Sequence, residues 1–490
     1  MSKNNTQRAL VFQGGGALGA YEAGVFLALY EVLPKKDERN GKKERELFDI
    51  IAGTSSGAMN GAILVSHVKQ KGTWNGAADT LNNFWNYVSR DQFGGKIGII
   101  TEGEQFLPSF DYWWEKWHSI NPRIASEEAA RRYYSTKQFL FTGVPHVFSP
   151  LIPRQDERFL DNFGMPNNMW YIYNNRPLKQ SVEGFVQFPI KTEEHYDKNH
   201  KPRLLLVSVD VQEGSTVTFD SYPKHDGKWK SEYGNYFKKD KDDNKGWYEY
   251  TITYDGGITA NHVMASCSVP INYDYANINV DKLKAIDNQG NPTFERLNHY
   301  FWDGGLASNT PLRELIQSHK DYWINVKGEG KEDAEVPDLD VFIVDMWPSK
   351  EENIAMDHDS AIDRKIDLLL NDKTDYDEKV ANIVSDYIQL FKKTREVALN
   401  YIRGQNEKKA FQTDLDKFLT NENTKSVHRT GQVRQYKDLI NGRFDINVMR
   451  IERSNDTDDI SNKLFDYSTD TIDQLIGHGY DDALRRLSTL

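Results

Sequence analysis

Short apolar runs and helical patterns alternate in the first part of the chain. Residues 9–13 and 47–52 are apolar runs that predict two buried strands. Each run is followed by side chains at the spacing of one helix face, which are Tyr21, Val25, Leu29 and Leu33 after the first, and Ala58, Ala62, Val65 and Lys69 after the second. Pro34 and the charged stretch 35–46 are expected to end the first helix. Strand–helix units in series predict an α/β fold.

The later part of the chain changes in character. Residues 203–210 and 341–345 read as buried strands, whereas residues 223–245 are rich in Lys, Asp and Gly and predict an exposed hairpin or insertion. Beyond Pro348, helical periodicity recurs among many charges. We therefore expect a sheet-containing domain over residues 1–348 and a mostly helical extension over residues 349–490.

A glycine-rich turn joins the first predicted strand to its helix, with the sequence Gly14-Gly15-Gly16-Ala17-Leu18-Gly19. Free backbone N–H groups at a helix start bind negative charge. The glycine spacing also matches a dinucleotide fingerprint, which would make the protein a nucleotide-binding oxidoreductase. That alternative requires a carboxylate at the tip of the next strand, and none stands there. A purely structural glycine turn is a further alternative to the anion-binding turn.

The second predicted strand ends in Gly53-Thr54-Ser55-Ser56-Gly57. In this pattern a serine sits on a sharp, strained turn between a strand and a helix, and the flanking glycines relieve the crowding. Because Gly53 and Gly57 flank it, Ser55 rather than Ser56 is the predicted nucleophile. A structural turn is the alternative.

Two Asp-Gly-Gly sequences offer a base for that serine. Asp303-Gly304-Gly305 follows an apolar, strand-like run, and burial makes a carboxylate a stronger base. Asp255 follows a polar stretch and is interpreted as part of a hairpin turn. A Ser-His-Asp triad is the competing chemistry, and both His319 and His358 come late enough in the chain to serve it.

Together these motifs resemble the patatin-like phospholipase family, over about residues 8 to 315. A further block, residues 262–270, resembles the family's Ala-Ser-x-Ala-x-Pro segment. In the family the catalytic Asp-Gly-Gly follows that block, which favours Asp303 over Asp255. Leu18 stands where many relatives carry Arg or Lys.

The resemblance implies an acyl hydrolase with a mainly parallel central sheet flanked by helices. It implies a Ser–Asp dyad without histidine, in which Ser55 is the nucleophile and Asp303 the proton acceptor. The oxyanion would be held by the backbone N–H groups of Gly15 and Gly16. The remaining motif glycines are Gly14, Gly19, Gly53, Gly57, Gly304 and Gly305. The substrate would be a lipid or another ester, cleaved with release of a fatty acid. A catalytically idle interaction protein on the same fold is a further possibility.

Composition narrows the choice of partners and compartment. The formal net charge of −12 argues against nucleic acid. The polar start and the lack of any apolar run of membrane-spanning length predict a cytoplasmic protein that contacts membrane surfaces only transiently. The single cysteine, Cys267, excludes an intrachain disulfide and is expected to be a buried packing residue. No metal-ligand motif is present, so we expect neither metal nor cofactor.

Aromatic residues cluster in residues 106–117, which contain two Phe, one Tyr and three Trp. Core packing is one interpretation. A lid or acyl-chain channel is the other, since aromatic rings suit a membrane–water interface.

Overall fold

The structure of the protein is a computed structural model. It describes residues 6–42, 45–90, 126–151, 170–193, 201–238, 247–286, 292–328, 334–351, 357–420, 422–423, 434–454, 456 and 458–488. The aromatic segment 106–117 lies outside these ranges, so its role as lid or core stays a prediction.

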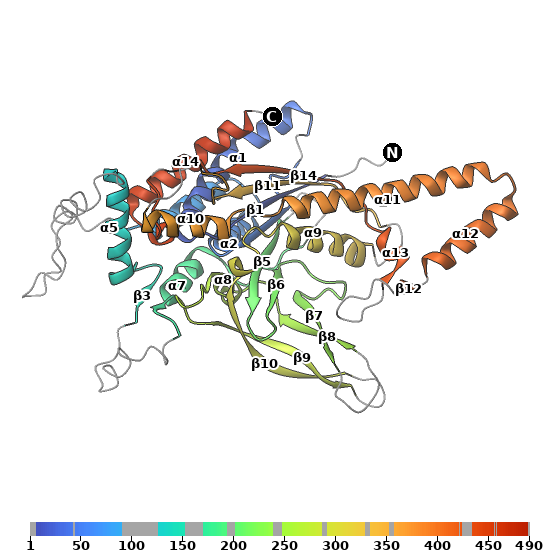
Figure 1. The fold of residues 1–490 in the computed structure, drawn as a ribbon, viewed down its shortest axis with the longest axis horizontal. Coiled ribbons are helices and arrows are strands. Elements are labelled where there is room, and N and C mark those ends of the chain that lie inside the picture. The colour runs from blue at the N-terminus through green and yellow to red at the C-terminus, as the bar shows by residue number, and fades with distance from the viewer. Residues whose placement is uncertain are drawn as a thin grey trace, which may run out of the picture.

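One large mixed sheet organises the chain (Figure 1). Its strands follow the order β14-β11-β1-β2-β5-β10-β9-β8-β7, and β6 also pairs with β5. The strands are β1 (Gln7–Phe12), β2 (Ile50–Thr54), β5 (Arg203–Asp210), β6 (Ser215–Asp220), β7 (Lys230–Lys238), β8 (Trp247–Asp255), β9 (Ala276–Ile286), β10 (Pro292–Asp303), β11 (Leu339–Asp345) and β14 (Ile446–Glu452). Two-residue ladders also form between β3 (Ser149–Pro150) and β4 (Tyr173–Asn174), and between β12 (Glu422–Asn423) and β13 (Arg434–Gln435).

The sheet has a parallel half and an antiparallel half. Strands β14, β11, β1, β2 and β5 pair in parallel. From β5 onward, β10, β9, β8 and β7 pair antiparallel. The predicted α/β class with a parallel centre is confirmed. Strand β7 lies within residues 223–245, for which the sequence predicted an exposed hairpin or insertion, and it pairs with β8, which begins at Trp247.

Helices cover both faces of the parallel half. On one face, alternate strand residues such as Leu10 and Phe12 pack with α1, α2 and α14, whereas on the other Ala9 and Val11 pack with α9 and α11. The helices are α1 (Gly19–Arg39), α2 (Ser56–Lys71), α3 (Ala77–Val88), α5 (Glu127–Thr142), α7 (Arg176–Phe185), α8 (Ala260–Cys267), α9 (Leu312–Asp321), α10 (His358–Leu370), α11 (Asp375–Tyr401), α12 (Gln405–Leu419), α13 (Tyr436–Leu439) and α14 (Thr469–Leu487). Single turns include η1 (Gly16–Leu18), η3 (Gly304–Leu306), the π-helical η4 (Tyr322–Lys327) and η6 (Lys463–Phe465).

The first helix runs through the proline that was expected to stop it. Helix α1 contains Pro34 and ends at Arg39. A proline inside a helix removes one N–H donor, which other contacts can offset. Here Asp37, in the turn after Pro34, accepts two hydrogen bonds from the buried Arg8 guanidinium at 2.8 and 3.0 Å. The side chain of β1 thus holds the last turn of α1 in helical form.

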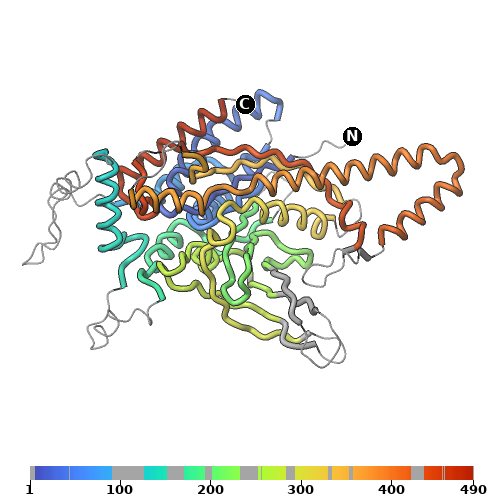
Figure 2. Tube along the Cα trace, in the orientation of Figure 1, coloured from blue at the N-terminus to red at the C-terminus, as the bar shows by residue number. Residues whose placement is uncertain are grey.

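Helix α1 packs closely against α14, the last helix of the chain (Figure 2). A Cβ on Gly24 would lie 1.9 Å from the carbonyl oxygen of Ile476, so only glycine permits this approach. Together with η1, α1 is the one described helix long and apolar enough to cross a membrane, which corrects the expectation that no such stretch exists. Of its most apolar window, 72% is buried inside the protein, as in a core helix.

Residues beyond Pro348 complete the sheet rather than standing apart from it. Strand β14 pairs with β11 over seven residues and forms one edge of the parallel half. Helices α10 to α12 supply the expected helical character. The boundary between residues 348 and 349 stays a prediction, and β14 and α14 show that both sides of it share one sheet and one core.

A buried ion cluster anchors η6 to α10. The Lys463 ammonium lies 2.7 Å from Asp367, 3.0 Å from Asp459 and 3.1 Å from Asp363, and its side chain is only 4% exposed. Asp459 also accepts hydrogen bonds from Arg453. Because burying unpaired charge is costly, each member of such a cluster depends on the others.

We expect Lys463→Ala to lower the free energy of unfolding by about 3–5 kcal/mol, because it leaves buried carboxylates without their cation. The matched control is Lys179→Ala, whose ion pair with Glu183 is exposed and spans 4.0 Å; that change should cost no more than about 1 kcal/mol. Urea denaturation followed by circular dichroism measures both. Equal, small losses would show that the cluster is not a structural anchor.

Candidate active site

Ser55 sits on the sharp turn that the sequence predicted. It lies between β2 and α2 with φ 55° and ψ −120°, a conformation that a residue with a side chain rarely adopts. A Cβ on Gly53 would lie 2.3 Å from the carbonyl oxygen of Gly57, and one on Gly57 would lie 2.6 Å from Phe12 Cβ. The flanking glycines therefore let the turn fold back tightly against β1.

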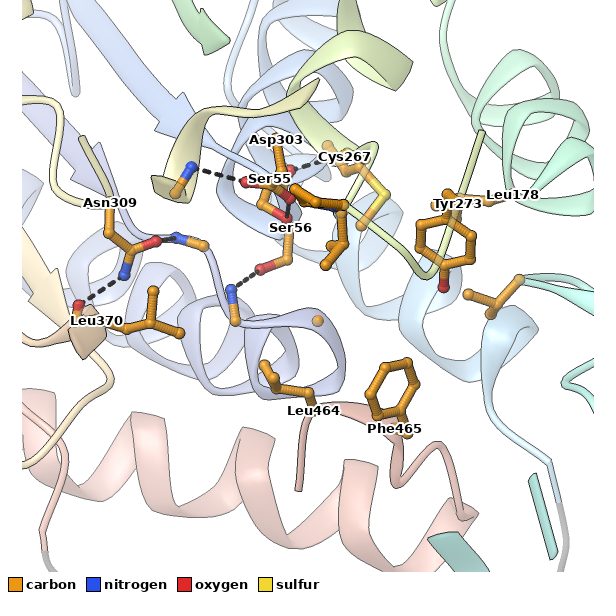
Figure 3. A pocket seen from close by; sticks show the side chains of 18 of the residues that line it. Ser55, Ser56, Leu178, Cys267, Tyr273, Asp303, Asn309, Leu370, Leu464 and Phe465 are labelled. Carbon is orange, nitrogen blue, oxygen red and sulfur yellow. Dashed lines mark hydrogen bonds between the residues drawn. The ribbon is translucent and has the colours of Figure 1, made fainter. Parts of the chain in front are cut away.

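The register of β5 brings the two predicted catalytic residues together. Strand β2 pairs with the first part of β5 and ends with Thr54 opposite Val207. Strand β10 approaches from the other direction and ends with Asp303 opposite Ser208. Since β6 occupies the other edge of β5, β2 and β10 share one edge and meet end to end. Ser55 Oγ donates a hydrogen bond of 2.6 Å to Asp303 Oδ2 at this junction (Figure 3).

Asp303 is a buried carboxylate with raised basicity. Its residue is only 6% exposed, and burial raises the pKa of Asp303 to about 6, even though hydrogen bonds from Ser55 and from the Gly305 N–H favour the ionised form. The Gly305 N–H donates to Oδ1 at 2.7 Å, which leaves Oδ2 directed at the serine. A Cβ on Gly304 would lie 2.3 Å from the Val207 carbonyl oxygen, so this turn needs glycine as well.

Helix α8 holds the backbone of Ser55 on both sides. The Ser266 hydroxyl accepts a hydrogen bond from the Ser55 N–H at 2.9 Å and donates to the Val207 carbonyl at 2.6 Å. The Cys267 thiol donates to the Ser55 carbonyl at 3.2 Å. Cys267 is buried as predicted, but it also lines the cavity beside Ser55. Sequence reasoning did not identify these contacts; the only signal was that both residues stand in the block of residues 262–270.

The glycine-rich turn lies beside Ser55, and its N–H groups are partly engaged. The Gly14 N–H donates to Asn309 Oδ1 at 3.1 Å, and the Gly15 N–H donates to the Ser56 hydroxyl at 2.9 Å. Gly16, with φ +55°, begins η1, where an N–H has no acceptor within the helix. Of the two predicted oxyanion donors, the Gly16 N–H therefore lies at a helix start. The Gly15 N–H already donates to the Ser56 hydroxyl and must give up that hydrogen bond before it can donate to an oxyanion.

An apolar cavity of about 180 Å³ opens next to Ser55 and Asp303. Its apolar walls come from α2, α7, the segment after α8 and the C-terminal region. Figure 3 shows Leu370 of α10 and Leu464 and Phe465 of η6 on the side of the cavity away from Ser55 and Asp303. The residues beyond 348 therefore form part of the cavity wall, which the sequence did not reveal.

Comparison with known proteins identifies the family. The sequence model of the family described as Patatin-like phospholipase matches residues 10–316. The chain belongs to the patatin-like phospholipase family. Its members are lipid acyl hydrolases, and that class of activity holds for the chain at the level of the family. The predicted patatin-like fold is confirmed in the same way.

Individual curated proteins and solved structures were also compared with the chain. None of the curated proteins compared with the chain matches it. Among solved structures, VipD from Legionella pneumophila aligns over 99% of this chain and 67% of its own, at 10% identity. The TM-score of that alignment is 0.29, a likeness too weak to bear on fold or function.

The competing site residues lie elsewhere in this patatin-like chain. His319 is fully buried, with Nε2 2.8 Å from the Pro337 carbonyl oxygen, and burial lowers its pKa to about 3. His358 begins α10 and is exposed. Neither histidine lines the cavity. Asp255 ends β8, and the Gly256-Gly257 turn after it leads into α8, so the expected hairpin turn is wrong: the next element is a helix.

The geometry around the glycine-rich turn does not favour a dinucleotide site. Such a site would need a carboxylate after the second strand, where Ser55 stands. The Leu464 backbone also abuts Gly16, because a Cβ on that glycine would lie 2.5 Å from the Leu464 carbonyl oxygen. In the part of the chain that the structure describes, no group of three His, Cys, Asp or Glu side chains could hold a metal. The expected lack of a cofactor stays a prediction.

The raised pKa of Asp303 predicts how the rate of ester hydrolysis depends on pH. Only the ionised carboxylate can accept the Ser55 proton, so we expect kcat/KM for a soluble p-nitrophenyl ester to fall as the pH drops through about 6 and to be level above it. A pH–rate profile of the free enzyme, with circular dichroism at each pH as a folding control, measures this. A limb near the ordinary Asp value of about 4 would contradict the burial of the base.

Proposed function

We propose that the protein hydrolyses the fatty acyl esters of phospholipids through a Ser55–Asp303 dyad. The observation that supports it most strongly is the 2.6 Å hydrogen bond from Ser55 Oγ to Asp303 Oδ2 at the edge of an apolar cavity. A serine hydroxyl is a poor nucleophile until a base takes its proton, and the Asp303 carboxylate lies within hydrogen-bond reach of the Ser55 hydroxyl.

In the first step Ser55 Oγ attacks the acyl carbon while its proton passes to Asp303 Oδ2. The carbonyl oxygen becomes an oxyanion that accepts a hydrogen bond from the Gly16 N–H. The Gly15 N–H donates to the oxyanion as well, after it has released the Ser56 hydroxyl. The ester C–O bond then breaks, and Asp303 returns the proton to the departing alcohol oxygen of the lipid. Preorganised donors at the oxyanion stabilise this transition state because they need no reorganisation as charge develops.

In the second step water takes the place of the departed alcohol. Asp303 accepts one of its protons as its oxygen attacks the acyl-enzyme carbonyl, and the oxyanion forms again at the same donors. The Ser55–acyl bond breaks, the fatty acid leaves, and the proton on Asp303 returns to Ser55 Oγ. Every proton is carried by Ser55, Asp303, the substrate or water, so the proposed cycle requires neither metal nor nucleotide.

The walls of the cavity suit an acyl chain better than a polar group. Apolar side chains that line it include Met59, Val147, Leu178, Val269, Pro270, Leu306, Leu370, Leu464 and Phe465. Burying apolar surface is favourable at roughly 25 cal/mol per Å², so each methylene placed here adds to binding. We propose that the protein is cytoplasmic and reaches such a substrate by transient contact with a membrane surface.

Substitution of the dyad tests the proposal. Ser55→Ala is expected to abolish hydrolysis of phospholipid vesicles and p-nitrophenyl esters, and Asp303→Asn to lower turnover by about a hundredfold to ten-thousandfold, since it keeps the shape but loses the proton acceptor. Asp255→Asn is the matched control and should be close to silent. Steady-state rates and melting temperatures are measured together.

Two results would overturn the dyad. Near wild-type turnover in Ser55→Ala would place the nucleophile elsewhere, and a catalytically idle interaction protein would show no ester turnover in the wild type. A large loss on replacing His319 or His358, with the melting temperature unchanged, would instead indicate a triad.

Substitution of two adjacent leucines tests whether the apolar wall of the cavity binds the acyl chain. Leu370 lines the cavity, whereas its neighbour Leu369 is 60% exposed and does not. Leu370→Trp narrows the cavity, so kcat/KM on a palmitate ester should fall roughly tenfold or more while a butyrate ester is little affected. Leu369→Trp should leave both rates unchanged. Equal losses on both esters in Leu370→Trp would argue against an acyl site here.

A further inference from the structure

Helix α11 exposes a long apolar stripe that the proposed catalysis does not use. Its exposed members are large side chains, among them Tyr387 at 68%, Leu390 at 61% and Tyr401 at 84% exposed. They recur at alternating spacings of four and three residues. The stripe, called the α11 seam below, consists of Tyr376, Val380, Ile383, Tyr387, Leu390, Val397 and Tyr401, with the polar, exposed Thr394 at one position of the same spacing.

This spacing is the heptad pattern of a coiled coil. Tyr376, Ile383, Leu390 and Val397 take the d positions, and Val380, Tyr387, Thr394 and Tyr401 the a positions. A repeat of 3.5 residues keeps one face of a helix directed at a partner helix. The seam runs for about 38 Å at 1.5 Å per residue. Exposed apolar surface of this extent marks an interaction site in a folded protein.

The opposite face of α11 is the one that joins the body of the protein. Ser385 and Ile388 are buried, and Arg450 of β14 binds Glu378 at 2.8 Å. The helix begins against α9 and β14 and then projects outward, as Figure 1 and Figure 2 show. The seam is thus presented to the outside by a helix whose N-terminal half is anchored to the body of the protein.

The seam is complementary to itself when a second copy runs in the opposite direction. Its midpoint falls between Ile388 and Gln389, and residues equally far from it then lie at the same height. In an antiparallel coiled coil an a position faces a d position. The resulting layers pair Tyr376 with Tyr401, Val380 with Val397, Ile383 with Thr394, and Tyr387 with Leu390, so every layer joins an a to a d residue.

The residues beside the seam fit the same register. On one flank Val384 of one copy faces Phe391 of the other, which extends the apolar contact. On the other flank Asp386 faces Lys393, and two-fold symmetry repeats this ion pair. In a parallel pair Asp386 would instead face Phe391, and Lys393 would face Ala398. Charge complementarity therefore selects the antiparallel arrangement.

We propose that α11 is a self-association surface that pairs with α11 of a second copy of this chain as an antiparallel, two-stranded coiled coil. The interface is isologous, since the same residues are used on both copies, and so it closes at a dimer. The antiparallel direction also keeps the two protein bodies at opposite ends of the seam, because each body is attached to the N-terminal half of its own α11.

The full-length protein tests this by analytical ultracentrifugation across the micromolar range. The wild type should sediment with twice the monomer mass of 56.6 kDa, and Leu390→Asp should be a monomer. The matched control, Leu369→Asp, changes an equally exposed leucine on α10 outside the seam and should stay dimeric. Circular dichroism and melting temperatures check that the variants fold.

Charge reversal tests the antiparallel register itself. Asp386→Lys or Lys393→Asp alone should raise the dimer Kd roughly tenfold, because two attractive contacts become repulsive. The two changes combined should restore the wild-type Kd. Lys409→Asp, an exposed position on α12, serves as the charge control and should have no effect.

Four outcomes would overturn the proposal. They are a wild type that stays monomeric, a Leu390→Asp variant that stays dimeric, a Leu369→Asp variant that dissociates equally, and a double reversal that does not restore binding. A monomer that binds phosphatidylglycerol vesicles in the wild type but not in Leu390→Asp would instead assign the seam to a membrane surface.

Discussion

The site depends on how one edge of β5 is shared between two strands. Strand β2 runs parallel to β5 and stops at Val207, and β10 runs antiparallel and stops at Ser208. The two strand ends meet there, which places Ser55 and Asp303 face to face. The ladder hydrogen bonds of β5 therefore set the 2.6 Å contact, and any shift in either register would separate the two side chains.

Burial at this junction has two consequences that act together. It raises the pKa of Asp303 to about 6, which makes the carboxylate a better proton acceptor near neutral pH. It also surrounds Ser55 with apolar surface that suits an acyl chain. Part of that surface, Leu464 and Phe465, is held by the neighbouring Lys463 and its carboxylate partners. A structural ion cluster far along the chain thereby supports a wall of the cavity beside Ser55 and Asp303.

Local sequence signals were sufficient for the residues at strand ends. Ser55, Asp303 and the glycine-rich turn each follow a short apolar run, and a strand that ends in a tight glycine turn is visible in a few consecutive residues. Contacts that depend on distant pairing were not visible. Three such features arise from the tertiary fold. They are the hydrogen bonds of Ser266 and Cys267 to the Ser55 backbone, the hydrogen bond of the Gly15 N–H to Ser56, and the pairing of β14 with β11.

Errors at element boundaries have the same origin. Pro34 does not end α1, because Arg8 of β1 holds the turn beyond it through Asp37. After Asp255 the chain enters α8 instead of turning back as a hairpin. In α11 the helical periodicity was correct, yet only the structure separates the buried face with Ile388 from the exposed seam with Leu390.

We propose that Ser55 is an activated nucleophile because Asp303 accepts the hydrogen bond of its hydroxyl. Fluorophosphonate labelling followed by peptide mass spectrometry tests this most directly, since the probe reacts covalently with an activated serine. We expect a single adduct on Ser55 in the wild type and a much slower reaction at the same residue in Asp303→Asn. An adduct on Ser56, or labelling of Ser55 at an unchanged rate in Asp303→Asn, would contradict it.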